Sequence, residues 1–174
     1  MATDYEIIDN FLPSEIYKEL HDILLPVNHP IPLMEHLPWM YSDAISSTEG
    51  EEDKMLIAFI HMIYAHQPVS PLLEKLLPHI EKLNIKALIR IKCNLYPNTE
   101  TQKEHGMHTD FEFPHKAAIL SINTCNGYTK LEDGTKIASV GNRLLLFDAS
   151  TPHCSSTTTD QAVRVNINLN YFKK

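Results

Sequence analysis

A strict alternation of apolar and polar residues in two segments constrains the fold of this chain more than any other feature. In residues 88–96 and again in residues 163–170, every second side chain is apolar. Successive side chains of a β-strand point to opposite faces, so this period of two predicts two strands. Their polar faces carry Arg90, Lys92, Asn94 and Tyr96 in the first segment and Arg164, Asn166, Asn168 and Asn170 in the second. Alternation alone favours an antiparallel sheet with this face toward solvent.

Shorter strands are expected between these two segments, at residues 116–123, 135–140 and 143–148. Turn-forming glycines lie between and beside them, and they account for four of the five glycines in the chain: Gly106, Gly127, Gly134 and Gly141. Many short strands separated by turns are typical of a jelly roll.

The first 85 residues show helical spacing instead. An amphipathic helix is expected from Ser14, and residues 51–66 and 70–83 return to the same spacing. Residues 26–50 contain four prolines and predict a loop, which is a candidate active-site flap. We therefore expect an α+β fold that is mainly β, with N-terminal helices buttressing the jelly roll.

The length of the chain bounds its organisation. With 174 residues, 43% of them hydrophobic, it is long enough for one well-buried core and too short to expect two. We expect a single domain over residues 1–174, with a helical and loop half in 1–85 and the jelly-roll core, which would carry any site, in 86–174.

Three residues of the strand-rich half have the chemistry of a mononuclear iron site. His108 and Asp110 are two positions apart, a spacing that puts both side chains on one face of an extended strand, and His153 follows on a distant segment. Two imidazoles and one carboxylate form the facial triad that leaves coordination positions open on Fe(II). Such a site, inside a jelly roll, favours an inward orientation of the polar strand faces.

A His-x-Asp pair alone is weak support, because ten His and nine Asp in a chain of this length give roughly half such a pair by chance. Arginine is rarer. The chain has three, and Arg164 lies eleven residues after His153, which is enough for a turn and a return on a neighbouring strand. An Arg at a chosen position has a chance of roughly two per cent, so the conjunction of all four residues is specific.

Together these residues resemble the Fe(II)- and 2-oxoglutarate-dependent oxygenases, and within them the prolyl-4-hydroxylase-like branch. The pattern of that family is His-x-Asp, a distal His, and Arg or Lys about ten residues later. The resemblance covers residues 86–172, including segments 90–97, 126–129, 133–135 and 142–147. It implies a cupin-like double-stranded β-helix, with Fe(II) held by His108, Asp110 and His153.

The resemblance also implies the remaining roles. Dioxygen and 2-oxoglutarate would be co-substrates, ascorbate could support turnover, and hydroxylation of an unactivated C–H bond would release succinate and CO₂. Arg164 would pair its planar guanidinium with the distal carboxylate of 2-oxoglutarate, a geometry that Lys supplies less well. Tyr96, Asn94 and Asn166 are further candidates for contacts with the co-substrate.

Four residues are candidates for the substrate side: Trp39, Tyr41, His105 and Tyr128. For the aromatic ones a place in the core is the competing interpretation. The resemblance favours a prolyl or other amino-acid side chain of a protein or peptide, or a free amino acid, as substrate. A nucleic-acid N-demethylase of the same superfamily and a non-redox, cupin-like metal-binding protein remain alternatives.

The net charge, the first residues and the cysteines indicate which partners and which location to expect for this protein. A net charge of −7 lacks the basic surplus of a phosphate-backbone binder, so nucleic acid is not the expected partner. The first residues have no basic and apolar leader, and no apolar run approaches the roughly 20 residues that span a bilayer. Three widely spaced cysteines suggest neither disulfides nor structural zinc. We expect a soluble cytoplasmic protein that acts on a small molecule, peptide or protein and makes no membrane contact.

Overall fold

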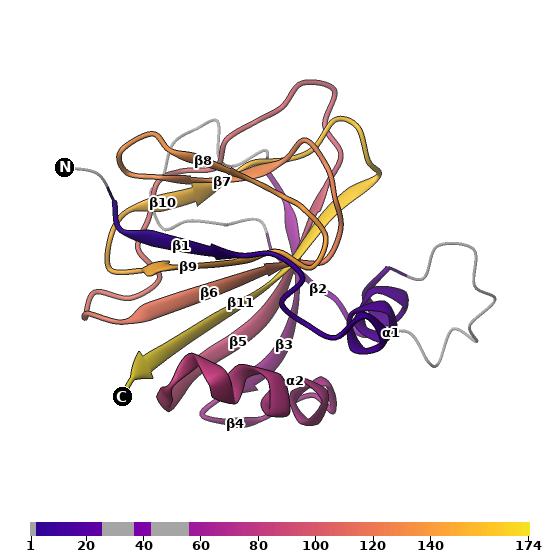
Figure 1. Ribbon diagram of the computed structural model, residues 1–174. Helices are drawn as coiled ribbons and strands as arrows, with labels where there is room; N and C mark the ends of the chain where they lie inside the picture. Colours follow the sequence, from indigo (N-terminus) through magenta and orange to yellow (C-terminus); the bar gives the residue numbers. More distant parts are fainter. Residues whose placement is uncertain (1–2, 26–36, 43–55) are drawn as a thin grey trace.

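The computed structural model describes residues 3–25, 37–42 and 56–174, and it is dominated by two antiparallel sheets (Figure 1). The larger sheet follows the order β1-β9-β6-β11-β5-β3-β2, with β4 paired to β3, and the smaller follows β10-β7-β8. The strands of the larger sheet are β1 (Tyr5–Ile8), β2 (Met40–Ser42), β3 (Ala58–Ala65), β4 (Gln67–Pro68), β5 (Ile85–Pro97), β6 (Lys116–Ser121), β9 (Leu144–Asp148) and β11 (Val163–Lys173). Those of the smaller are β7 (Tyr128–Leu131), β8 (Lys136–Ala138) and β10 (His153–Ser155). The expected jelly-roll class is confirmed.

Helices cover one face of the larger sheet. These are α1 (Ser14–Leu24), α2 (Leu72–Ile80) and the 3₁₀ turn η3 (Glu81–Leu83). Their buried leucines share one core with the apolar faces of β5 and β11, which include Ile91, Ile167 and Leu169. The expected buttress is confirmed, and Figure 1 shows α2 and the smaller sheet on opposite sides of the larger one. A second apolar cluster, which includes Ile119, Leu131 and Phe147, joins β6 and β9 to the smaller sheet.

The polar faces of β5 and β11 turn away from the helices and into the space between the sheets. Register places Arg164 opposite Tyr96, Asn166 opposite Asn94, Asn168 opposite Lys92 and Asn170 opposite Arg90. Arg164 and Asn170 are fully buried, so the solvent-facing interpretation of the alternation is wrong. We call these eight paired side chains of β5 and β11 the polar strip. In the interior of a domain they carry a desolvation cost, which hydrogen bonds or bound ligands must offset.

Residues 51–66 were expected to be helical, and the part that the structure describes is not. Ala58–Ala65 forms β3, which pairs with β5 and β2. This segment is apolar at nearly every position, and periodicity alone does not separate such a run from a buried helix. Its β-branched and aromatic residues Phe59, Ile60, Ile63 and Tyr64 favour the strand. The N-terminal half therefore adds strands β1 to β4 to its helices. Most of the proposed flap at 26–50 lies outside the described residues.

Core packing by α2 gives a direct test of the buttress. Leu76 is 1% exposed, whereas its neighbour Leu77 is 37% exposed. Leu76→Ala should lower the free energy of unfolding by about 2–5 kcal/mol, because it removes buried methyl groups and leaves a cavity. Leu77→Ala on the same helix is the matched control, and urea denaturation measures both. Equal effects of the two changes would contradict the packing.

Candidate metal centre

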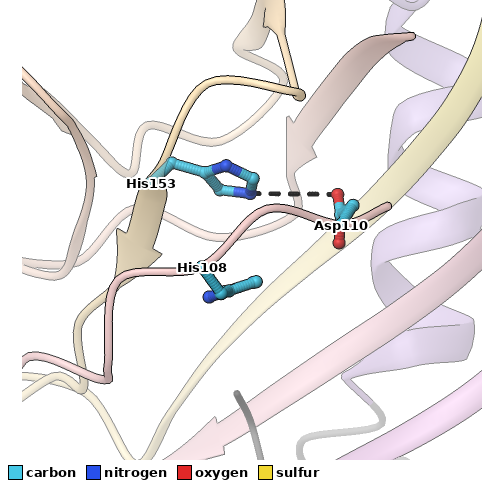
Figure 2. Close-up of side chains that lie close together, drawn as sticks. All are labelled: His108, Asp110 and His153. Carbon is cyan, nitrogen blue, oxygen red and sulfur yellow. Dashed lines mark ion pairs between the residues drawn. The ribbon is translucent and has the colours of Figure 1, made fainter. Parts of the chain in front are cut away.

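His108, Asp110 and His153 converge in the space between the two sheets (Figure 2). One potential ligand atom from each lies within 4.8 Å of the others, and His153 Nε2 is 3.8 Å from Asp110 Oδ2. His153 belongs to β10, and an isolated bridge pairs its backbone with that of His108. His108 and Asp110 were expected on a regular strand, and this is wrong: they lie in the connection between β5 and β6. The bridge to β10, rather than a strand of their own, positions them.

Backbone hydrogen bonds fix the tautomer of both histidines. Nδ1 of His108 donates to the carbonyl of Gly106 at 3.0 Å, and Nδ1 of His153 donates to the carbonyl of Thr151 at 3.1 Å. Each Nε2 therefore keeps a lone pair for a metal ion, as is common for ligating histidines. Burial lowers the pKa of His153 and so favours the neutral imidazole, although the carboxylate of Asp110 acts in the opposite direction.

Asp110 is held as an anion by the polar strip. Oδ1 accepts a hydrogen bond from Arg90 at 2.9 Å, and Oδ2 accepts bonds from Asn168 at 3.1 Å and Asn170 at 2.8 Å. Burial would raise the pKa of Asp110, but the charges of protonated His153 at acid pH, Arg90 and Lys92, with the Asn170 bond, hold it well below its usual value. Supporting contacts of this kind orient a ligating carboxylate. A carboxylate and two neutral imidazoles fit a divalent iron ion.

A cavity beside the three residues is lined mainly by the polar strip and the ends of β2 and β3. Its described walls are Ser42, Ala58, Ile60, Lys92, Asn94, Tyr96, His108, Asp110, Ile119, His153, Ser155, Asn166 and Asn168. Three of the four expected co-substrate residues, Tyr96, Asn94 and Asn166, are among them. The amide of Asn94 donates to that of Asn166 at 2.9 Å, and Tyr96 accepts from Ser155 at 3.2 Å.

Arg164 is fully buried next to this cavity and does not line it. Its guanidinium carbon lies 5.5 Å from the centre of the Tyr96 ring. It donates to the carbonyl of Ser156 at 3.0 Å and to the Thr129 hydroxyl at 3.1 Å, while its Nε–H has no acceptor among the described residues. No described carboxylate forms an ion pair with it. A buried guanidinium without a counter-ion is costly, and it fits a site for an anionic ligand.

The four residues expected on the substrate side do not line the cavity. His105 is buried against Tyr96, with ring centres 5.0 Å apart, and its Nδ1 donates to the carbonyl of Ser155. Trp39 packs against the helix-side core, and Tyr41 is exposed on that same side of β2. Tyr128 donates to the carboxylate of Glu104 on the opposite face of β7 from Thr129.

Sequence reasoning did not assign roles to several residues that the structure places at the site. Arg90, Asn168 and Asn170 hold Asp110, and Lys92 lines the cavity. Burial, with the nearby charge of Arg90, lowers the pKa of Lys92 to about 8. All four belong to the polar strip that the alternation revealed, so the signal was present. Arg143, in contrast, pairs with Asp9 at the surface and does not line the cavity.

Comparison with solved structures identifies the architecture. A prolyl hydroxylase from Trichoplax adhaerens, in complex with a peptide fragment of the hypoxia-inducible factor oxygen degradation domain, is 18% identical with a TM-score of 0.63; the match covers 99% of this chain and 84% of that one. A Pseudomonas putida prolyl-4-hydroxylase is 14% identical with a TM-score of 0.59, over 99% and 94% of the two chains. The epimerase SnoN, from nogalamycin biosynthesis, in complex with Fe³⁺ and α-ketoglutarate is 11% identical with a TM-score of 0.70, over 98% and 79%. The chain has the fold of the 2-oxoglutarate-dependent Fe(II) oxygenases.

Similarity to this oxygenase fold is visible in structure and not at the level of whole sequences. No protein-family model matches the chain, and no curated protein sequence matches it. Within the described residues, no helix is long and apolar enough to cross a membrane. The fold thus agrees with the resemblance drawn from the sequence, and it does not by itself establish an activity.

Proposed function

We propose that this protein is an Fe(II)- and 2-oxoglutarate-dependent dioxygenase that hydroxylates an unactivated C–H bond, with release of succinate and CO₂. The observation that carries the proposal is the coincidence of two features in one oxygenase fold. His108, Asp110 and His153 present three ligand atoms within 4.8 Å of one another, and the fully buried Arg164 has no described counter-ion. Bound iron would supply the activation of dioxygen that no protein side chain supplies.

The residues of the chain have separate tasks in this reaction. The carbonyls of Gly106 and Thr151 keep Nε2 of the two histidines available for the metal. Arg90, Asn168 and Asn170 keep Asp110 ionised and oriented. Arg164 would bind the distal carboxylate of 2-oxoglutarate, next to the ring of Tyr96, which lines the cavity. Asn94 and Asn166 would contribute amide hydrogen bonds from the wall of the cavity.

The substrate class that the resemblance favours is an amino-acid side chain, either in a peptide or protein or in a free amino acid. Structures with this fold include a hydroxylase in complex with a peptide. The net charge of −7 disfavours the nucleic-acid alternative. The non-redox metal-binding alternative predicts no conversion of 2-oxoglutarate, which distinguishes it from the oxygenase.

Anaerobic titration tests the co-substrate site. Protein loaded with Fe(II) is titrated with 2-oxoglutarate, and chelation of the iron is followed by visible absorption. We expect saturable binding at one equivalent, and the absorption change should be absent without iron. A failure of 2-oxoglutarate to perturb the iron would contradict the proposal.

Gly127 offers a test of the Arg164 assignment that leaves the arginine itself in place. A Cβ at this position would lie 2.6 Å from Arg164 Cδ and 3.0 Å from the carbonyl of Thr157. Gly127→Ala should therefore displace the arginine, weaken 2-oxoglutarate binding, retain iron binding, and cost about 1–3 kcal/mol of stability. Gly134→Ala is the control for 2-oxoglutarate binding alone: its Cβ meets nothing within 4 Å, whereas its φ of +88° strains any L side chain and lowers stability by itself. Unchanged 2-oxoglutarate affinity in Gly127→Ala would show that the carboxylate binds elsewhere.

A further inference from the structure

Lys92 and the amide oxygen of Asn168 are two cavity-lining polar groups with no hydrogen-bond partner among the described residues; the amide nitrogen of Asn168 is the group that bonds to Asp110. They lie directly opposite each other in the register of β5 and β11, and both line the cavity next to Asp110. On its other side, Lys92 is paired in register with Met62 of β3. The pair therefore lies in the part of the cavity that β3 closes.

Both residues line the cavity and have hydrogen-bonding capacity that no described residue uses. Among the described residues, Lys92 has no ion pair. The carboxylate of Asp110, whose charge acts on Lys92, already accepts one hydrogen bond from Arg90 and one each from Asn168 and Asn170. Asn168 is 6% exposed, and its Oδ1 has no donor among the described residues. An ammonium group and a buried amide oxygen thus belong to one cavity wall without partners among the described residues, and the unpartnered amide oxygen carries a desolvation cost that a ligand N–H would offset.

The position of this pair separates it from the proposed co-substrate site. Arg164 is four residues before Asn168 on β11, a separation of about 13 Å along a strand. The three candidate metal ligands lie near Asn168 and not near Arg164, because Asp110 accepts hydrogen bonds from Asn168 and Asn170. A 2-oxoglutarate that extends from the metal toward Arg164 leaves Lys92 and Asn168 free. The remaining walls on this side are Ser42, Ala58 and Ile60, from β2 and β3.

The charges around the cavity indicate which charge a ligand bound next to Lys92 and Asn168 should carry. Among the described residues, three cations, Arg90, Lys92 and Arg164, lie in or beside it, against the single carboxylate of Asp110. A divalent metal would add to the positive charge, and a dianionic co-substrate would offset only part of it. A second anion is therefore favoured electrostatically, and among these three cations Lys92 is the one that both lines the cavity and has no ion pair with a described residue.

We propose that Lys92 and Asn168 bind the substrate that is hydroxylated. The ammonium of Lys92 donates to a carboxylate of this substrate, and Asn168 Oδ1 accepts a hydrogen bond from an N–H of the same molecule. The substrate is then a small carboxylic acid carrying an amino or amide group, such as a free amino acid, rather than a residue within a polypeptide. This inference rests on the proposed oxygenase function and narrows its substrate class.

Binding under anaerobic conditions tests the proposal without turnover. Protein loaded with Fe(II) and 2-oxoglutarate is screened by thermal denaturation against the twenty proteinogenic L-amino acids and, in parallel, against their α-carboxamides. We expect at least one acid to raise Tm while its carboxamide does not. In Lys92→Met the affinity for that acid should fall at least tenfold, which corresponds to loss of one charge-assisted hydrogen bond, and Lys92→Arg should recover part of it.

Lys86→Met is the matched control, since Lys86 lies on the same strand and is exposed; it should bind the acid as wild type does. Binding of carboxamides as tightly as acids, or no stabilisation by any acid, would overturn the proposal. The acid-against-carboxamide comparison needs only wild-type protein and holds even if Lys92→Met is unstable. A loss of 2-oxoglutarate binding in Lys92→Met would also overturn it, by placing Lys92 at the co-substrate. If 2-oxoglutarate itself fails to stabilise wild type, the oxygenase proposal falls first.

Discussion

Replacement of either His108 or Asp110 by alanine is expected to lower Fe(II) affinity by at least about a hundredfold and to abolish 2-oxoglutarate turnover, with the fold retained. Residues that only support a metal ligand commonly account for 10- to 100-fold in affinity, so loss of a ligand should exceed that. Both residues lie in the connection between β5 and β6, outside the two apolar clusters. Iron binding is measured by anaerobic titration, and the fold by circular dichroism.

His79→Ala is the control for this pair of changes. His79 lies on α2, on the opposite side of the larger sheet from the three candidate ligands. It should bind iron and convert 2-oxoglutarate as wild type does. Wild-type iron affinity in His108→Ala would remove the basis for the metal centre.

Arg164→Met is expected to raise the 2-oxoglutarate concentration needed for half-maximal turnover by about ten- to a hundredfold, with little change in Fe(II) affinity. A charge-assisted hydrogen bond of about 1.5–3 kcal/mol corresponds to this range. Methionine retains much of the volume of a side chain that is fully buried, so packing is disturbed less than by alanine. Arg164→Lys should recover part of the affinity, because it restores the charge without the planar pair of donors.

Arg143→Met provides the comparison for Arg164. Arg143 pairs with Asp9 at the surface, where ion pairs contribute little to stability, and it is remote from the cavity. Its change should leave the 2-oxoglutarate requirement unaltered. If Arg164→Met instead lost iron and 2-oxoglutarate together, the arginine would be supporting the fold around the Ser156 carbonyl.

Much of the fold and of the candidate metal centre could be predicted from the sequence, because local pattern and residue chemistry carry them. The alternation in β5 and β11 is strict, and the long strands there follow it. The three ligand candidates could be found because few residue types bind iron. In β3, in contrast, apolar residues fill both faces, since one face meets the helices and the other meets the cavity. Periodicity then does not distinguish a strand from a buried helix.

The network around the metal centre could not be assigned from one sequence, because it depends on register. Asn170 reaches Asp110 only because β11 pairs with β5 so that Asn170 lies opposite Arg90. Likewise, the sequence does not indicate that an isolated bridge to His153, rather than a strand, positions His108. Tyr128 and Trp39 were placed near the substrate on residue type alone, and packing puts both on other faces.

Succinate formation from 2-oxoglutarate tests the central claim most directly. Wild-type protein and His108→Ala are compared with anaerobically added Fe(II), then oxygen and ascorbate, in the presence of the acid that best stabilises the wild-type complex and also without any added substrate. We predict succinate from wild type above the level of the variant, increased by that acid. Equal, background succinate from both proteins under both conditions would contradict the assignment of this chain as a 2-oxoglutarate-dependent oxygenase.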